Sequence, residues 1–388
     1  MEKIYFDHNA TTPVDREALA EMLPYLKEEW GNPSSIHWAS RKPRTALDRA
    51  REQVAAFLNC TPLEIIFTGT GTESDNLAIK GTAYSKRKKG NHIITTKVEH
   101  PAVLNTCKYL EKEGFEVTYL GVDALGMIDL DELKGSITDR TILITIMYAN
   151  NETGVIFPIE EIARIAREKG VTMHTDAVQA AGKLPLDMKK LDVDLLSISG
   201  HKLYGPKGTG ALFARRGVRL VPVIHGGHHE RNRRGGTENV AGLVGLGKAC
   251  EIAARDMEKE VTHLKNLRDR LEKGFMEKIP DIKINGDPEK RLPNTANVSF
   301  EFVEGESLLL SLDMLGIAAS SGSACTSGSL EPSHVLLAMS LSHEMSHGSV
   351  RFSLGKENTV EEIDYLVENM PPIVERMRSM SPLYAGTK

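Results

Sequence analysis

Lys202 occupies a position where a buried lysine would be chemically useful. It lies within Ser199–Gly210, between two short apolar runs, Asp194–Ile198 and Ala211–Ala214, that are typical of buried strands. Lysine is rarely buried without a partner, and a desolvated lysine loses its proton more easily and becomes a nucleophile for Schiff bases. This stretch alone is equally consistent with a solvated lysine in a surface loop, so other motifs must decide.

Four more sets of polar residues follow other strand-like runs in the same way. They are Gly69–Glu73, Glu99–Pro101, Asn150–Gly154 and Asp176–Gln179. Each set alone is more typical of turns, and the first would also serve as a capping turn with Thr72 as the N-cap of a helix. In open α/β sheets, however, ligands bind outside the carboxyl ends of the strands. We therefore expect the five sets to meet at one edge of one sheet.

Together these residues suit one cofactor, pyridoxal 5'-phosphate. Its phosphate needs donors near a helix N-terminus, its aldehyde needs an amine, and the protein must orient and tune its ring. The sequence offers Thr72, Ser199 and His201 for the phosphate, Lys202 for the aldehyde, Asp176 for the pyridine nitrogen and His100 for stacking on the ring. The sequence thus predicts a pyridoxal phosphate site at this sheet edge.

A second constellation surrounds Cys325. The segment Ser320–Ser329 is rich in serine and poor in bulky residues. Such a composition is typical of a mobile surface loop, where a cysteine is available to react. The alternative is a linker with an incidental cysteine. The other cysteines, Cys60, Cys107 and Cys250, lie near a turn or in helical patterns, and we expect them to be packing residues.

Arg351 stands inside a strand pattern, between Ser349–Val350 and Phe352–Gly355. An arginine in that position needs a buried partner, or it holds a carboxylate through two parallel hydrogen bonds. The sequence leaves both an internal salt bridge and a substrate carboxylate open.

Two histidine groups have the residue types of metal sites. His343–His347 matches the H-E-x-x-H of zinc hydrolases. Gly348 follows at once and a strand pattern begins, so the segment is short for the helix that this chemistry needs. The histidine- and arginine-rich turn at 225–234 favours a positively charged loop that faces a phosphate. We therefore predict no firm metal site, apart from Cys325 as a transient ligand of an iron–sulfur cluster.

Strands and helices alternate from about residue 62 to 215. Strand patterns at 64–68, 92–96, 115–119, 141–147 and 170–176 are separated by helical patterns at 72–88, 101–113 and 158–169. This alternation predicts an α/β fold with a mostly parallel, doubly wound sheet.

A second, smaller α+β unit follows a long charged helical pattern at 247–279. It has strand patterns near 296–301 and 350–354 and a final helix from about Val360. We predict a large cofactor-binding domain at 14–250 and a small domain made of 1–13 and 251–388. The small domain carries the cysteine loop at about 320–333, and the N-terminal strand at 4–6 belongs beside it.

Length and composition exclude several classes of protein. The 388 residues, 40% of them hydrophobic, suffice for two domains with sizeable cores. The net charge of −5 gives no basic surface for nucleic acid or anionic lipid. No apolar run reaches the roughly 18 residues of a membrane span, the N-terminus lacks a signal-peptide core, and four scattered cysteines suggest no disulfide framework. We expect a cytoplasmic protein without nucleic-acid or membrane partners.

Motifs spread over nearly the whole chain carry a family resemblance. They are Tyr5–Thr12, Gly31–Ser35, Thr72–Asn76, Glu99–His100, Asn150–Gly154, Asp176–Gln179, Ser199–Lys202, Arg234–Asn239, Ser321–Ser327 and Arg351–Ser353. Together they resemble the NifS/IscS-type cysteine desulfurases, within the class V aminotransferase superfamily of fold-type I pyridoxal phosphate enzymes. The long cysteine loop resembles the branch of this family with an extended mobile loop.

The resemblance implies roles for individual residues. Lys202 would hold the cofactor as a Schiff base and move the substrate's Cα proton, His100 would stack on the ring, and Cys325 would carry the sulfur. The substrate carboxylate would be oriented by Asn151 and Arg351. The full cofactor-binding set implied by the resemblance is Gly71, Thr72, Asn151, Asp176, Gln179, Ser199, His201, Lys202 and Thr237.

The resemblance also implies the reaction and the partners. L-cysteine would become L-alanine, and the sulfur would pass as a persulfide on Cys325 to an acceptor protein such as an iron–sulfur scaffold. Thr237 would reach the phosphate of a neighbouring subunit, which implies a homodimer. The alternatives are a selenocysteine lyase or another class V pyridoxal phosphate enzyme and, in a different class, a scaffold that binds a metal or cluster.

One motif departs from the family pattern. The family more often has Ser-Gly before the residue that matches Gly71, where this chain has Gly69 and Thr70. We expect the hydroxyl of Thr70 to replace that serine.

Overall fold

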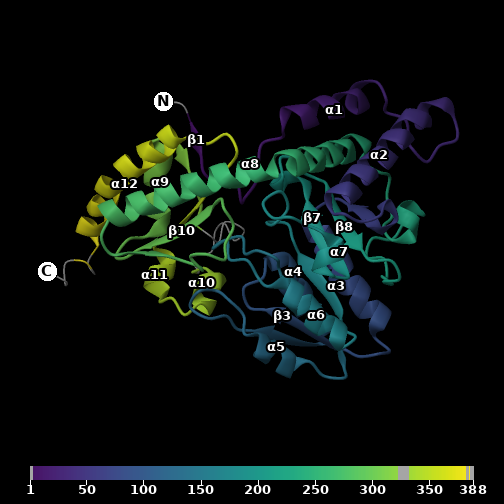
Figure 1. Ribbon diagram of the computed structural model, residues 1–388, viewed down its shortest axis with the longest axis horizontal. Helices are drawn as coiled ribbons and strands as arrows, with labels where there is room; N and C mark the ends of the chain where they lie inside the picture. Colours follow the sequence, from purple (N-terminus) through teal and green to yellow (C-terminus); the bar gives the residue numbers. More distant parts are fainter. Residues whose placement is uncertain (1–2, 322–331, 382–383, 385–388) are drawn as a thin grey trace.

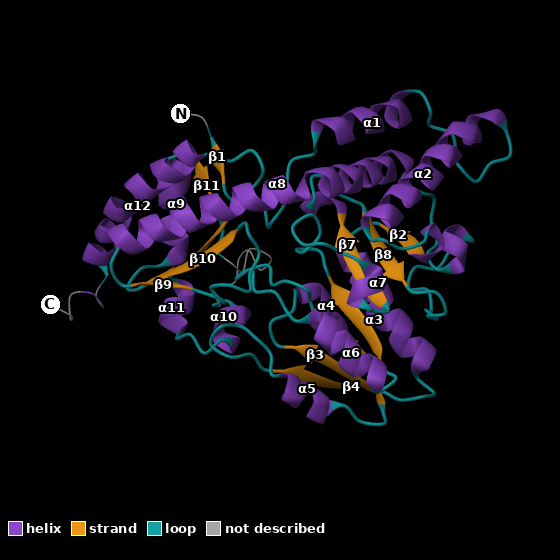
Figure 2. Cartoon of the chain, in the orientation of Figure 1, coloured by secondary structure: helices purple, strands orange, loops and turns teal. Residues whose placement is uncertain are grey.

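The computed structural model describes residues 3–321, 332–381 and 384. Figures 1 and 2 show a larger unit and a smaller unit, with one long helix, α8 (Val240–Lys278), running from one to the other. Each unit has a hydrophobic core of its own. No helix among the described residues is long and apolar enough to span a membrane.

The larger unit is built on a seven-stranded sheet with the order β2-β8-β7-β6-β5-β3-β4. Its strands are β2 (Ile65–Thr68), β3 (His92–Thr96), β4 (Glu116–Leu120), β5 (Thr141–Thr145), β6 (Thr172–Asp176), β7 (Leu195–Ser199) and β8 (Gly210–Ala214). The strands from β7 to β4 are parallel, and β8 is antiparallel to both of its neighbours. The mostly parallel sheet predicted from the sequence is confirmed.

Helices cover both faces of this sheet. On one face, α3 (Gly71–Lys86) and α4 (Pro101–Lys112) pack against Ile93 of β3. On the other face lie α2 (Arg41–Phe57), α6 (Ile159–Glu168), α7 (Met188–Leu191) and the start of α8, in the core that contains Ile94. Successive side chains of a strand point to opposite faces, so the sheet is doubly wound, as predicted. Helix α1 (Arg16–Lys27) lies on α8, and α5 (Leu130–Ser136) lies beside β4.

The smaller unit combines an antiparallel sheet with four helices. The sheet has the order β12 (Ser349–Ser353), β10 (Thr295–Phe300) and β9 (Ile282–Ile284). The helices are α9 (Gly305–Met314), α10 (His334–Ala338), α11 (His343–His347) and α12 (Val360–Met380). The N-terminal strand β1 (Ile4–Tyr5) pairs with β11 (Ile317–Ala318) in this unit, as the sequence predicted. Phe275 of α8 packs edge to face on Phe300 and Phe352 at 6.0 and 5.5 Å between ring centroids.

Helix α8 belongs to both units. Its first half contributes to the core of the larger unit, and its second half, from Leu264 to Phe275, contributes to the core of the smaller one. It begins at Val240, where the Asn239 side chain caps it, seven residues before the predicted start. The predicted domain boundary between residues 250 and 251 falls inside this helix. A continuous helix therefore fixes the relative position of the two groups of site residues described below.

Candidate active site

The turn between β2 and α3 forms the first part of the site. Thr70, and not Thr72, caps α3, because its hydroxyl oxygen accepts a hydrogen bond from the Glu73 N–H at 3.0 Å. The helix thus starts at Gly71, one residue before the predicted start. The Thr70 oxygen is engaged in this cap, so only its O–H remains to donate in place of the family's serine. A Cβ on Gly71 would lie 3.2 Å from the Ser199 Cβ, so glycine lets this turn approach the end of β7.

Two buried polar atoms lie unsatisfied at the neighbouring strand ends. Ser199 Oγ and Gln179 Oε1 have no hydrogen-bond partner within the described residues. The other end of the Gln179 amide is fixed, because its Nε2 donates to the Asn9 carbonyl at 3.0 Å. Buried polar groups are nearly always hydrogen-bonded, so these two atoms indicate the position of a ligand.

Lys202 lies in a 3₁₀ turn, Gly200–Lys202, directly after β7, and it is half-buried. Its Nζ donates hydrogen bonds to the backbone carbonyls of Asn9 and Ala10, the latter at 2.9 Å. The amine is therefore anchored by two neutral acceptors of the N-terminal segment. The surface-loop alternative for Lys202 is wrong.

Asp176 ends β6 at the same edge of the sheet, and only 7% of it is exposed. Burial raises the pKa of its carboxyl to about 6, although the Val178 N–H, at 2.9 Å, and the charge of Lys202 both work in the opposite direction. A carboxyl in this state readily ionises when a cation comes near. It can therefore pair with a protonated ring nitrogen.

Two histidines of the site are uncharged at neutral pH. Burial, with the charge of Lys202 as a further cause, lowers the pKa of both His100 and His201 to about 4. His100 caps α4, and its Nδ1 accepts the Ala102 N–H at 3.1 Å, which puts the ring proton on Nε2. The His201 Nδ1 lies 3.2 Å from the hydroxyl oxygen of Thr11. His100 thus offers a neutral aromatic face for stacking, and His201 is a neutral hydrogen-bonding ring.

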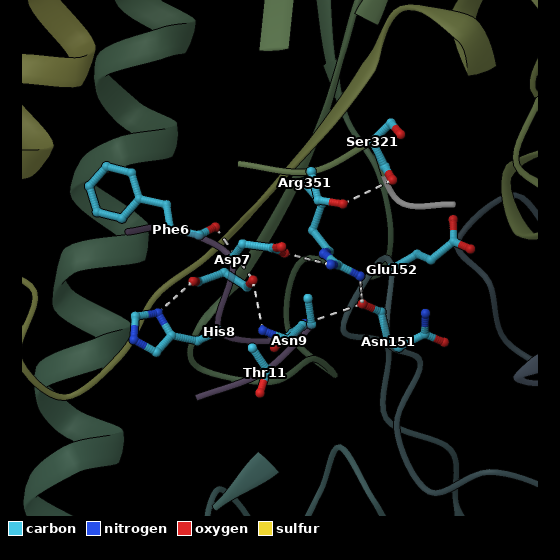
Figure 3. A network of polar contacts seen from close by, with 12 residues as sticks. Phe6, Asp7, His8, Asn9, Thr11, Asn151, Glu152, Ser321 and Arg351 are labelled. Atoms are coloured by element: carbon cyan, nitrogen blue, oxygen red, sulfur yellow. Dashed lines mark hydrogen bonds and ion pairs between the residues drawn. The ribbon is translucent and has the colours of Figure 1, made fainter. Parts of the chain in front are cut away.

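Arg351, in β12 of the smaller unit, is 2% exposed and lies in the polar network of Figure 3. Its Nη2 donates to the Asp7 carboxylate at 2.8 Å, and its Nη1 donates to the backbone carbonyl of Asn151 at 2.9 Å. Its Nε is buried without a partner within the described residues. The internal salt bridge that the sequence left open is present, and one donor of the guanidinium remains for a ligand.

Asn9 is a site residue to which the sequence reasoning gave no role. Its side-chain amide donates to Thr295 Oγ1 at 2.9 Å and to the Asn151 carbonyl at 3.2 Å, and its Oδ1 accepts from Asn294 at 3.0 Å. Its carbonyl meanwhile accepts from Lys202 and Gln179. The N-terminal segment therefore joins the sheet edge to the Arg351 network. The only signal in the sequence was the polar motif directly after the first strand.

Two predicted site residues lie away from this cluster or outside the described residues. Cys325 falls in 322–331, outside the described residues. Ser320, which precedes that segment, pairs through its backbone with Arg351, in hydrogen bonds of 2.6 and 3.2 Å. Thr237 is exposed and lines a hollow together with Gly69 and Arg234 of its own chain.

The charged groups of the turn at 225–234 are bound within the chain. Glu230 forms a bidentate ion pair with Arg51, with distances of 2.6 and 2.7 Å. Arg231 donates to the Ile65 carbonyl at 2.5 Å, and Arg234 pairs with Glu73 at 2.9 Å. The arginines of this loop neutralise a carboxylate and cap carbonyls around β2, and its phosphate-facing role stays a prediction.

The remaining histidines and cysteines have ordinary environments. His343 and His347 are exposed on the five-residue helix α11, directly before β12. No group of three metal-ligating side chains occurs within residues 3–321, 332–381 and 384. Cys107 and Cys250 are buried and Cys60 is half-buried, and burial raises the pKa of each thiol. All three are packing residues, as predicted.

Comparison with known proteins identifies the family. The sequence matches the model of the class-V aminotransferases over residues 4–366, and the chain belongs to this family. A cysteine desulfurase from Trichormus azollae is 56% identical over 382 residues, or 98% of this chain and 95% of that protein.

Two solved structures resemble the chain over most of its length. A NifS-like protein superposes with a TM-score of 0.91 at 41% identity, covering 97% of this chain and 100% of that one. SspA in complex with cysteine superposes with a TM-score of 0.81 at 39% identity, covering 92% and 100%. These similarities confirm the predicted fold-type I architecture.

Pyridoxal 5'-phosphate is the cofactor of this family, and the described residues fit it. Ser199 Oγ and Gln179 Oε1 are unsatisfied buried atoms of the kind that a phosphate and a ring hydroxyl would satisfy. Lys202 supplies the amine and Asp176 the acidic partner, at the same edge of the sheet.

Proposed function

We propose that this chain is a pyridoxal phosphate-dependent cysteine desulfurase, which converts L-cysteine to L-alanine and passes the sulfur to an acceptor protein. The observation that carries the proposal is the convergence of Lys202, Asp176 and two unsatisfied buried polar atoms at one sheet edge. The similarity to a cysteine desulfurase and to a protein solved with cysteine indicates the substrate.

The sheet edge holds the cofactor and moves the proton. Bound pyridoxal phosphate supplies an aldehyde and an electron-withdrawing ring. Lys202 would hold the cofactor through its Nζ, and the same nitrogen, once released, would take the Cα proton of the substrate. The Asn9 and Ala10 carbonyls hold this nitrogen next to the ring site. Asp176 would hold the ring nitrogen in its protonated form, because a carboxylate stabilises an adjacent positive charge.

The smaller unit orients the substrate. Arg351 binds the carboxylate of cysteine through its Nε, the donor that no described residue occupies. Asn151 contributes beside Arg351, because its carbonyl accepts a hydrogen bond from Arg351 Nη1. Arg351 and the Asn9 side chain share the Asn151 carbonyl, and the Asn9 carbonyl accepts from Lys202, which supports binding of the substrate between Arg351 and Lys202.

Cys325 receives the sulfur. Its thiolate attacks the substrate sulfur, an S–S bond forms, and the carbon–sulfur bond breaks with its electron pair left on carbon. One proton is taken up at Cβ and Lys202 returns a proton to Cα, which completes alanine, and Cys325 carries a persulfide. Ser320, which precedes Cys325 in the sequence, is the backbone partner of Arg351, the proposed ligand of the substrate carboxylate.

The chain is proposed to act as a cytoplasmic homodimer that delivers sulfur to an iron–sulfur scaffold or another sulfur acceptor. Exposed apolar side chains on and after α1, including Leu26, Trp30 and Trp38, support a contact with a second copy. Large exposed apolar groups of this kind mark interaction surfaces. The exposed Thr237 is then available to a neighbouring subunit's phosphate.

The test compares the purified wild type with Cys325→Ser. After incubation with L-cysteine, the wild type forms alanine and carries one extra sulfur on the Cys325 peptide. The serine variant keeps the yellow cofactor but forms neither alanine nor sulfide. Normal alanine formation by the variant would refute the desulfurase proposal and favour a selenocysteine lyase or another enzyme of the family. Absence of a cofactor band in the wild type would favour a metal- or cluster-binding scaffold.

A further inference from the structure

Asp75 is a buried acid that the proposed mechanism does not use. It lies in the second turn of α3 and is 1% exposed, although it is a carboxylic acid. Helix α3 packs against β5, β6, β7 and β8, so Asp75 lies behind the sheet edge that carries the site. Its Oδ1 has no hydrogen-bond partner within the described residues. An ionised carboxylate with an unsatisfied buried oxygen is very costly, and a neutral acid is much less so.

The groups that face Asp75 include no strong cation. From β6 they are Asp176 and His174, from β7 Ser197, and from the turn after β3 Glu99. The His174 Nε2 lies 3.7 Å from Asp75 Oδ1. No lysine or arginine of the described residues forms an ion pair with Asp75.

His174 is not a charged partner for Asp75. The ring is fully buried, and each nitrogen already faces a hydroxyl: Nδ1 lies 2.8 Å from Thr145 Oγ1, and Nε2 lies 3.0 Å from Ser197 Oγ. A neutral ring, with one donor and one acceptor, satisfies both contacts. Burial lowers the pKa of His174 to about 3, which agrees with a neutral ring.

We propose that Asp75 is a positioning residue that keeps its proton in the folded protein and thereby leaves the negative charge of this region to Asp176. Burial first, and then the charge of Asp176, raise the pKa of Asp75 well above its ordinary value, against the lowering effect of the Ser197 hydroxyl. The inference rests on the proposed role of Asp176 as partner of the ring nitrogen.

The consequence for the site follows from the repulsion of like charges. Two adjacent buried carboxyls do not both ionise readily, and the one with the better-solvated or hydrogen-bonded oxygen ionises first. Asp176 has the Val178 N–H and the positive charge of Lys202, whereas Asp75 has an unsatisfied oxygen. The proton therefore stays on Asp75, and Asp176 faces the cofactor ring as the anion.

The test compares the wild-type holoenzyme with Asp75→Asn and Asp75→Ala. Asparagine has nearly the shape of the protonated acid and no charge, so we expect a Kd for pyridoxal phosphate within about twofold of wild type. We also expect the pH at which the cofactor absorbance titrates to stay unchanged in Asp75→Asn. Asp75→Ala is uncharged as well, so its cofactor absorbance should also titrate at the wild-type pH, while the volume lost behind Asp176 should raise the Kd about tenfold. A shifted titration in Asp75→Asn would overturn the proposal, because it would mean that Asp75 carries a charge in the folded protein.

A second experiment measures the midpoint of urea unfolding as a function of pH for the wild type and Asp75→Asn. Asp139→Asn is the matched control, because Asp139 is exposed. An acid that is protonated when folded and ionised when unfolded lowers stability as pH rises above its unfolded pKa. The wild type should therefore lose stability relative to Asp75→Asn from about pH 4 toward pH 8, while the control follows the wild type. A lower midpoint for Asp75→Asn at neutral pH would mean a charged pair with His174 and would also overturn the proposal. If the proposed function is wrong, the wild type will form no alanine. The stability comparison does not depend on alanine formation and can still be interpreted.

Discussion

The two halves of the proposed site differ in how their polar groups are satisfied. At the sheet edge, Ser199 Oγ and Gln179 Oε1 are buried without partners in the described part of the chain. Around Arg351, the chain supplies its own carboxylate, Asp7, at 2.8 Å. The cofactor half is thus shaped for a group that the chain lacks, whereas the substrate half already contains a mimic of the substrate's carboxylate. A substrate must therefore share Arg351 with Asp7.

The largest effect is expected from Lys202→Ala in the cofactor half. Loss of the amine removes both the covalent anchor and the base, so kcat should fall by at least about 10³. Lys183→Met is the matched control, because Lys183 lines the same hollow as Lys202 but donates to the Gln179 carbonyl. Steady-state alanine formation measures both variants. An equal loss of kcat in both variants would contradict the assignment of Lys202 as the anchor and base.

Arg351→Ala should have the next largest effect, and it should fall on substrate binding. Truncation of a buried, hydrogen-bonded charge typically costs about 2–5 kcal/mol, which corresponds to a rise in KM for cysteine of about thirtyfold or more. The cofactor absorbance should not change, because the side chain of Arg351 contacts Asp7 and the Asn151 carbonyl and not the groups proposed to hold the cofactor. A lost cofactor band with an unchanged KM would contradict the assignment of Arg351 to the substrate.

Asp7→Asn tests whether Asp7 and the substrate carboxylate compete for Arg351. Here KM for cysteine is expected to fall, whereas in Arg351→Ala it is expected to rise. Removal of the internal carboxylate should lower KM for cysteine by about two- to fivefold, the range of a weak ion pair. The asparagine side chain keeps a hydrogen-bond acceptor for Arg351 Nη2. A rise in KM would show that Asp7 supports Arg351 and does not compete with the substrate.

The smallest effect concerns Glu99 of the sheet edge, measured as stability. Burial raises the pKa of this acid to about 8, although the Met147 N–H and the Thr96 hydroxyl lower it. The folded protein then holds a proton that the unfolded chain releases, so stability falls as pH rises from about 4.5 to 8. Glu99→Gln should therefore have a Tm about 2–4 °C above wild type at pH 8, with a smaller difference toward pH 4. A lower Tm at pH 8 would mean that Glu99 is ionised.

Much of the cofactor half was predictable from the sequence because it depends on local order. Buried strands such as Thr141–Thr145 show as apolar runs, and parallel strands end at one edge, so Lys202 and Asp176 could be placed together. The start of α8 was missed because its first turns contain Gly242, Gly245 and Gly247. A Cβ at Gly247 would lie 2.8 Å from Ala50 Cα, so glycine is there for close helix packing and hides the helical pattern.

The substrate half could not be assembled from the sequence alone. The Asp7–Arg351 pair and the bonds of Asn9 to Thr295 and Asn294 join segments almost 300 residues apart or more. The hydrophobic periodicity of a sequence does not reveal contacts between such distant segments. The protonation of Asp75 was equally hidden, because it depends on which strands its helix covers. The family resemblance named Arg351 but not the carboxylate beside it.

The most direct test of the account is the location of the cofactor's covalent bond. Borohydride reduction of the holoenzyme, followed by proteolysis and mass measurement, should find the reduced cofactor on the Lys202 peptide and nowhere else. A label on Lys183, or no labelled lysine, would contradict the assignment of the sheet edge as the cofactor half of the site.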